Sequence, residues 1–208
     1  MILFIIPLNC CNGYQVNKLE NPRFLKNTEK NLRRKQKQLS RKMKGSNKRK
    51  KARRILANVH EKITNTRNDF QHKLTRAIVD ENQAVIVETL SSVNMLKNRR
   101  LSKVMADVAW HKFIIKLEYK LKEQGKYLRK VDRYFASSKI FHHCGEKINK
   151  LELSTRKWQC PKCKTMHDRD INADINIRNE GISMLQAEGL FVSAHRGLCK
   201  TSQVEVVA

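Results

Sequence analysis

The sequence has few acidic residues for its length. Its 208 residues include 44 lysine and arginine residues but only 19 aspartate and glutamate residues, which gives a formal net charge of +25. So large an excess of one sign opposes compaction unless a polyanion neutralises it. Nucleic acid is the polyanion that this charge favours, since phosphate neutralisation is the main source of non-specific affinity. A lysine-rich solvated surface without a specific partner is the alternative.

Long apolar runs are also absent. None is long enough to span a bilayer, so the sequence predicts no membrane partner. The apolar residues 1–8 lack the positively charged start and the small-residue cleavage site of a signal peptide. We interpret residues 3–8 as a buried strand, followed by a hairpin turn at Asn12-Gly13 and a return strand. The expected location is therefore cytoplasmic, and nucleoid-associated when the protein is bound to DNA.

One long segment contains no acidic residue at all, from Lys30 to His60. Leucines every seven residues, followed by an apolar stripe over 55–78, predict two antiparallel helices across 24–80 with a break at 45–47. The basic side chains around the break are predicted to contact phosphates, with a solvated charged hairpin as the alternative. They are Arg33, Arg34, Lys35, Arg41, Lys42, Lys48, Arg49, Lys50, Lys51, Arg53 and Arg54.

The apolar run at 84–87 is typical of a strand buried on both faces, and it ends at Glu88. A carboxylate at the carboxyl end of such a strand lies where open α/β sheets place their chemistry. A glutamate that simply emerges into solvent is the alternative. Residues 127–131 predict a second strand.

Two more helices are predicted in the second half of the chain. Residues 101–124 form one helix that ends before Gly125, with Leu101, Val104, Val108 and Ile115 on one stripe. Residues 172–185 have helical character, and the tail at 189–208 has no clear periodicity.

Three of the six cysteines lie in one stretch, at Cys144, Cys160 and Cys163. Two cysteines three residues apart on a tight turn can direct both sulfurs at one tetrahedral ion. This spacing in a strongly basic chain favours a metal site over a disulfide. Position 141, where the partner of Cys144 is expected, is occupied by Phe141, which cannot ligate. His142 or His167 could complete a zinc site of three cysteines and one histidine.

These segments together resemble a known family. Residues from about 21 to 190 resemble the C-terminal half of TnpB-type proteins, the OrfB group of transposon-encoded RNA-guided nucleases, which are related to type V CRISPR effectors. The matching segments are NPRFLKNTEKNLRRKQKQLSRKMKGSNKRKKARR, VIVETLSSVNMLKN, LEYKLKEQGKYLRKVDRYFASSK and CPKCKTMHDRDINADINIRNEG.

The resemblance implies an α/β fold of the RNase H-like, RuvC type: a mixed sheet with a long basic helical hairpin and an inserted zinc ribbon. The implied activity is magnesium-dependent cleavage of DNA guided by an RNA, with DNA and a guide-type RNA as partners. The implied domains are a partial nuclease domain over 1–136, the ribbon over 137–168, the end of the nuclease domain over 169–188 and a loose tail over 189–208.

The site residues implied by the resemblance are incomplete. Glu88 matches the second acidic position of the family and Asp170 the third, and the cysteines match three of four zinc ligands. The first acidic position has no match, because no aspartate precedes Asp69. We therefore expect an N-terminally truncated chain that lacks the first strand and is impaired in catalysis.

Two alternatives stay open. One is an RNA- or DNA-binding module without catalysis that modulates a full-length relative. The other is an active nuclease whose missing aspartate is supplied by another chain or by a rearranged residue.

Overall fold

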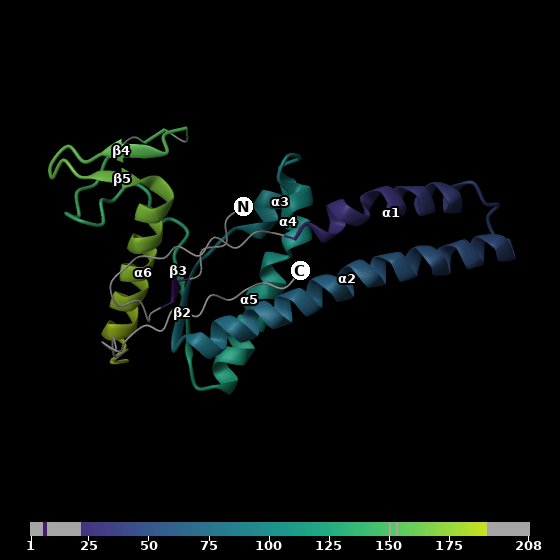
Figure 1. Ribbon diagram of the computed structural model, residues 1–208, viewed down its shortest axis with the longest axis horizontal. Helices are drawn as coiled ribbons and strands as arrows, with labels where there is room; N and C mark the ends of the chain where they lie inside the picture. Colours follow the sequence, from purple (N-terminus) through teal and green to yellow (C-terminus); the bar gives the residue numbers. More distant parts are fainter. Residues whose placement is uncertain (1–5, 8–21, 150, 153, 191–208) are drawn as a thin grey trace. The chain divides into compact units, whose positions relative to one another are not determined.

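The computed structural model describes residues 6–7, 22–149, 151–152 and 154–190 (Figure 1). The described residues fall into two compact units, one from 22–77 and 91–120, the other from 6–7, 78–90 and 121–190. The predicted turn at Asn12-Gly13, its return strand and nearly all of the predicted tail lie outside them. Within the described ranges, no helix is both long and apolar enough to cross a membrane.

The first unit contains a helical hairpin at the place that the apolar periodicity predicts. Helix α1 (Phe24–Ser40) and helix α2 (Asn47–Glu81) flank a turn in which Gly45 has a φ of 85°. Glycine adopts this left-handed conformation without steric cost. The hydroxyl of Ser46 accepts a hydrogen bond from the Arg49 backbone N–H at 3.2 Å, which caps the start of α2.

Contacts at both ends of the hairpin set its antiparallel arrangement (Figure 1). At the open end, the rings of Phe24 and Phe70 meet edge to face with centroids 5.7 Å apart. At the turn, the Arg49 guanidinium donates to the carbonyl oxygens of Lys42 at 2.8 Å and Leu39 at 3.3 Å. These carbonyls lie at the carboxyl end of α1, where a cation complements the helix dipole.

Three short helices follow, where the sequence predicts only one: α3 (Ser92–Lys97), α4 (Ser102–Val108) and α5 (Trp110–Glu123). The prediction of a single helix over 101–124 is wrong, because Ala109 adopts a left-handed conformation with φ 49°. The break also changes the buried face. Leu101, Val104 and Ile115 of the predicted stripe are exposed, whereas the unit buries a different apolar set. That set includes Met105, Trp110, Phe113 and Leu117.

Polar groups join α5 to α2. Lys116 donates through Nζ to Gln71 Oε1 at 2.7 Å and to Asn68 Oδ1 at 3.1 Å, and Lys120 donates to Thr75 Oγ1 at 2.9 Å. Both lysines are buried. Desolvation, followed by nearby positive charges, lowers the pKa of Lys116 below its ordinary value.

The second unit is an α/β structure with a mixed three-stranded sheet. Strand β2 (Ala84–Glu88) pairs in parallel with β3 (Tyr127–Val131) along its whole length and antiparallel with β1 (Ile6–Pro7). The predictions of strands at 84–88 and 127–131 are confirmed. Residues 84–87 are all buried, as a continuous apolar run predicts.

Helix α6 (Arg169–Ala187) packs against this sheet (Figure 1). The contact is close at Gly181, where an added Cβ would lie 2.4 Å from Ile86 Cγ2. Leu185, one turn further along, packs with Ala84. Before α6, strands β4 (Lys157–Gln159) and β5 (Met166–Asp168) form a small antiparallel hairpin.

Candidate functional site

Two tight turns, which we call the first and second knuckles, carry the three cysteines. In the first knuckle, residues 141–146, the Phe141 N–H donates to the Glu146 carbonyl at 2.8 Å, and the Gly145 N–H donates to the Phe141 carbonyl at 2.8 Å. In the second, residues 160–165, the Cys160 N–H donates to the Thr165 carbonyl at 3.0 Å. The Lys164 N–H completes it by donating to the Cys160 carbonyl at 3.0 Å.

The two knuckles therefore have the same backbone pattern. Their fifth residues also agree, since both Gly145 and Lys164 have positive φ, at 70° and 57°. The pattern aligns Cys144 with Cys163, and Phe141 with Cys160. Phe141 thus stands at the first ligand position of the first knuckle, as the spacing of the sequence predicts.

The three cysteines converge as predicted. The sulfurs of Cys144, Cys160 and Cys163 lie within 4.8 Å of one another, and the Cys144–Cys160 Sγ separation is 3.5 Å. Hydrogen bonds from Thr165, first from its side chain and then from its backbone, lower the pKa of the Cys163 thiol to about 5. A thiolate is the form that ligates metals, so the cluster can bind a metal ion.

Neither predicted histidine belongs to this cluster among the residues that the structure describes. The Nδ1 atom of His142 lies 2.9 Å from Asn172 Oδ1, and its backbone N–H donates to the same oxygen at 3.0 Å. His167 is buried with its ring centroid 5.1 Å from that of Phe141, and its Nε2 has no hydrogen-bond partner in the described part of the chain. In the part of the chain that the structure describes, the cysteines supply three metal donors and no fourth protein ligand joins them.

Two asparagines of α6 hold the first knuckle against the helix. Asn172 donates to the Ile140 carbonyl at 2.7 Å, and Asn176 donates to the carbonyls of Ser137 at 2.7 Å and Ile140 at 2.6 Å. Both asparagines are buried. Their spacing of four residues places them on one helix face, so the ribbon is fixed directly to the helix that carries Asp170.

Asp170 lies in the first turn of α6. Asp168 caps this helix, because its carboxylate accepts the N–H groups of Asp170 at 3.0 Å and Ile171 at 3.3 Å. The Asp170 carboxylate is 3.3 Å from the guanidinium of Arg156, which lies just before β4. Both partners are more than one-third exposed, so the stabilisation from this ion pair is small.

Glu88 ends β2, opposite the end of its parallel neighbour β3. Its side chain is half-buried, and this burial raises the pKa of the carboxyl above its ordinary value. The packing of α6 on the sheet shows which residues of α6 lie at the level of Glu88. Leu185 packs at Ala84 and Gly181 at Ile86, so α6 runs antiparallel to β2.

Two strand residues advance about 6.6 Å, which equals about four helical residues. Glu88 therefore lies level with about residue 177 of α6. Asp174 is two turns before Gly181 on the same face of the helix, and Asp170 is one turn further. This register places Asp174 nearer to the level of Glu88 than Asp170 is.

Asp174 is a half-buried carboxylate that the sequence reasoning missed. Burial raises its pKa to about 6, against an opposing effect of Arg178. Its Oδ1 has no hydrogen-bond partner among the described residues. The spacing of four residues from Asp170 was the signal that could have identified it. Apart from the cysteines, the described ranges bring no three acidic, histidine or cysteine side chains together as a metal site.

The predicted phosphate-contacting residues surround the turn of the hairpin. Nine of the eleven are exposed, and Lys35 and Arg49 are partly buried. The guanidinium of Arg49 donates hydrogen bonds to the carbonyls at the end of α1, so it stabilises the turn of the hairpin. The exposed residues are Arg33, Arg34, Arg41, Lys42, Lys48, Lys50, Lys51, Arg53 and Arg54.

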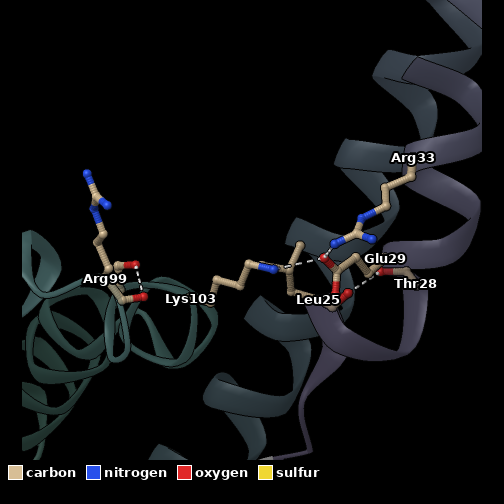
Figure 2. Close-up of polar contacts among 7 residues, drawn as sticks. Leu25, Thr28, Glu29, Arg33, Arg99 and Lys103 are labelled. Atoms are coloured by element: carbon tan, nitrogen blue, oxygen red, sulfur yellow. Dashed lines mark hydrogen bonds and ion pairs between the residues drawn. The ribbon is translucent and has the colours of Figure 1, made fainter. Parts of the chain in front are cut away.

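One of these basic residues has an acidic partner at the base of the hairpin. Figure 2 shows the Glu29 carboxylate between Arg33, at 2.6 Å on α1, and Lys103, at 3.0 Å on α4. The hydrogen bond from Lys103, together with the positive charge of Arg33, lowers the pKa of Glu29. Nearer the start of α1, the buried Asp107 of α4 accepts the Leu25 N–H at 3.0 Å.

Comparisons with known proteins give two family matches and several relatives. Residues 8–99 match the OrfB_IS605 family, which is described as a probable transposase, and residues 110–177 match the Cas12f1-like, TNB domain family. A Streptomyces pristinaespiralis protein named as a candidate RNA-guided DNA endonuclease is 44% identical over 166 residues, which cover 80% of this chain and 41% of the relative. A similarly named Escherichia coli K12 protein, InsQ, is 30% identical over 84% of this chain and 46% of the relative.

The fold has a solved counterpart. The cryo-EM structure of a Cas12f1-sgRNA-target DNA complex matches 86% of this chain and 49% of the Cas12f1 chain, with a TM-score of 0.54 at 22% identity. These matches define the class, that of transposase-type proteins with the fold of one part of Cas12f1. Within this class, the chain is most readily compared with the TnpB-type, OrfB-group proteins, to which its family matches and relatives are similar. It spans about two fifths of the length of the curated relatives it matches.

Proposed function

We propose that the chain binds RNA and DNA through the turn region of its basic hairpin, in the manner of a TnpB-type protein. The observation that carries this proposal is the exposed cationic surface formed by the end of α1 and the start of α2. Nine predicted basic residues are exposed there, and no acidic residue occurs between Lys30 and His60. Phosphates are the partners that such a surface recognises, since each contact releases condensed counterions.

The comparisons support the choice of nucleic acid. The relatives are named for RNA-guided action on DNA, and the solved counterpart is a complex with a guide RNA and a target DNA. A guide-type RNA and DNA are therefore the proposed partners. The proposed fold of the second unit is the RNase H-like, RuvC type, supported by the parallel pair β2–β3 with Glu88 at its carboxyl end.

The proposed chemistry of the second unit is hydrolysis of a phosphodiester with magnesium. Carboxylate oxygens suit magnesium, which proteins bind through one or two carboxylates together with substrate phosphates. Glu88 and Asp170 would hold it, with Asp174 as a further carboxylate on the same helix face as Asp170. Bound magnesium would stabilise charge that develops on the phosphate. The chain contributes the half-buried carboxylates and the sheet that positions them.

The second candidate function is binding without catalysis, and two observations favour it. Within the described ranges, no group of three carboxylates or histidines could hold a metal ion. Asp170 is also paired with Arg156, which competes with a cation for its carboxylate. In that case the hairpin and the ribbon would hold nucleic acid and modulate a longer relative.

A salt titration of binding tests the hairpin. The test variant has Lys50, Lys51, Arg53 and Arg54 all changed to glutamate. We expect the slope of log K against log salt for duplex DNA to become less steep by about 3–4, since each lost phosphate contact removes about 0.9 from its magnitude. The control carries four glutamates at exposed cations outside the hairpin, Lys97, Arg99, Arg100 and Lys122. It has the same net charge. An equal loss of slope in both variants contradicts a hairpin-specific site.

A nicking assay on a DNA duplex separates the two candidate functions. Catalysis predicts magnesium-dependent nicking by the wild type that disappears in Glu88→Gln and survives in the exposed control Glu123→Gln. The binding module predicts no magnesium-dependent nicking in any of the three proteins, with DNA affinity retained. Nicking that is equal in the wild type and Glu88→Gln would rule out the assigned role of Glu88.

A further inference from the structure

The ribbon contains an apolar core at the place where a fourth metal ligand would stand. Phe141 is fully buried, as is Cys160, the residue that occupies the equivalent position of the second knuckle. The centroids of the Phe141 and Trp158 rings are 3.7 Å apart. Ile148 and Leu151 pack against the same cluster. Phe141 therefore occupies the expected ligand position with a buried side chain that belongs to the ribbon core.

Phe141 also affects how the three cysteines can bind a metal ion. Sulfurs from Cys144, Cys160 and Cys163 lie together, but the corner that the knuckle pattern assigns to a fourth ligand is hydrocarbon. His142 is engaged with Asn172 of α6. His167 stays outside the sulfur cluster in the described part of the chain. Structural zinc sites are almost always closed by four protein ligands.

We propose that the ribbon folds around Phe141 without a metal ion, and that its three thiols form an incomplete zinc site that a single substitution, Phe141→Cys, completes. Two features of the structure support metal-independent folding. The first is the Phe141–Trp158 core, and the second is the attachment of the first knuckle to α6 by Asn172 and Asn176. The ring contact and the asparagine hydrogen bonds involve no sulfur atom, whereas the rest of the core cluster includes Cys160 and packs against Cys144 and Cys163. This proposal does not depend on the nucleic-acid-binding function.

Unfolding of the full chain with and without a strong chelator tests the proposal. The chain has two tryptophans, so a Trp110→Phe background leaves Trp158 as the fluorescent reporter beside Phe141. We expect the midpoint of the Trp158 transition to be the same with and without chelator. A lower midpoint in the chelator overturns the proposal, since a ribbon that depends on zinc loses its fold when the metal is removed.

Zinc affinity, measured by competition with a chromophoric chelator, gives the second readout. We expect Phe141→Cys to bind one zinc ion at least about 100-fold more tightly than the wild type, because even residues that only support a ligand contribute 10- to 100-fold. Its transition should also become sensitive to chelator. The control Phe141→Leu keeps an apolar side chain and should bind zinc as weakly as the wild type.

Two results would contradict the incomplete site. One is wild-type zinc affinity equal to that of Phe141→Cys. The other is tight wild-type binding that is lost in His167→Gln, which would show that the histidine completes the site. If Phe141→Cys does not fold even with zinc, unfolding of the wild type with and without chelator still distinguishes metal-independent folding of the ribbon from zinc-dependent folding.

Discussion

The two units of the chain differ in the joint between their main elements. In the helical unit, buried polar groups join neighbouring helices beside an apolar core: Lys116 binds Gln71 in the interior, and the carboxylate of Asp107 binds the Leu25 N–H. In the sheet unit, the joint is apolar and very close, with Gly181 of α6 against Ile86 of β2. A buried polar joint loses free energy when one partner is removed, whereas a close apolar contact tolerates little change in volume.

This difference matches the proposed roles. The helical unit carries the excess positive charge, and a bound polyanion would relieve the repulsion within it. The sheet unit has to hold Glu88 and the carboxylates of α6 at a fixed register, which close packing achieves. We therefore expect substitutions at the apolar joints of the sheet unit to cost more than substitutions at the polar joints of the helical unit.

The largest effect is expected at Phe141. Phe141→Ala removes a fully buried ring from the ribbon core, and we expect it to lower the free energy of unfolding by about 3–5 kcal/mol. Urea unfolding followed by Trp158 fluorescence in the Trp110→Phe background measures this. The control Tyr134→Ala, at a side chain that is 77% exposed, should change it by less than about 0.5 kcal/mol. A similar small loss in both variants would mean that the ribbon has no apolar core.

Gly181 tests the closeness of the joint between α6 and β2. Gly181→Ala forces a methyl group into the space of the Ile86 side chain, and overpacking of this kind costs about 1–3 kcal/mol. Because the clash involves Ile86, the substitution Ile86→Ala should make the change at Gly181 much less costly. Urea unfolding of the four proteins in this double-mutant cycle measures the coupling, and strictly additive losses would contradict the contact.

Asp174 should make the stability of the sheet unit dependent on pH. Its pKa is raised to about 6 in the folded chain, so the folded state binds more protons than the unfolded state between the ordinary value and about 6. The contribution of Asp174 to the free energy of unfolding should therefore fall as pH rises from about 4 to above 6. The free energy of unfolding of Asp174→Asn should lack this pH-dependent decrease. We expect the decrease to be about 1–2 kcal/mol after allowance for partial exposure.

Urea unfolding of the wild type and Asp174→Asn at pH 4 and pH 7.5 checks the sign. Burial also raises the pKa of Glu88, but this contribution is present in both proteins and cancels in the difference. A difference that is constant across this pH range would show that Asp174 titrates normally.

A smaller effect is expected at Asp107, in the helical unit. Asp107→Ala removes the acceptor for the Leu25 N–H and should cost about 1 kcal/mol, as the loss of a helix cap does. Asp107→Asn keeps an acceptor oxygen and should retain most of the stability. Thermal unfolding followed by circular dichroism compares the two. If both cost as much as Phe141→Ala, the contrast between the two units is wrong.

The smallest effect is expected at Glu29. Its ion pairs with Arg33 and Lys103 are at the surface, so Glu29→Gln should change stability only slightly, and less at high salt. The same circular dichroism measurement at low and high salt tests this. A cost as large as that of Asp107→Ala would show that these surface ion pairs join α1 to α4 more strongly than their exposure implies.

Local patterns predicted much of the fold. The hairpin helices, the strands at 84–88 and 127–131, and the convergence of Cys144, Cys160 and Cys163 all follow from periodicity and spacing. The break at Ala109 does not, because alanine is a strong helix former and gives no sign that tertiary packing will impose a left-handed conformation.

The unpredicted parts of the site depend on long-range contacts. Asp107 binds the start of α1 from 82 residues away, and Asn172 and Asn176 bind carbonyls more than thirty residues earlier in the chain. The burial of Asp174 likewise arises only in the folded chain. The roles of Glu88 and Asp170 stay predictions, since they come from the resemblance to the family.

The most direct test of the proposed function is photochemical crosslinking of the chain to a 4-thiouridine-substituted RNA and to a 4-thiothymidine-substituted DNA, followed by identification of the crosslinked peptides. The hairpin account predicts that the main crosslinks fall within residues 30–60 and decrease steeply with salt. Crosslinks confined to the ribbon or to the sheet unit, with none in this segment, would contradict it.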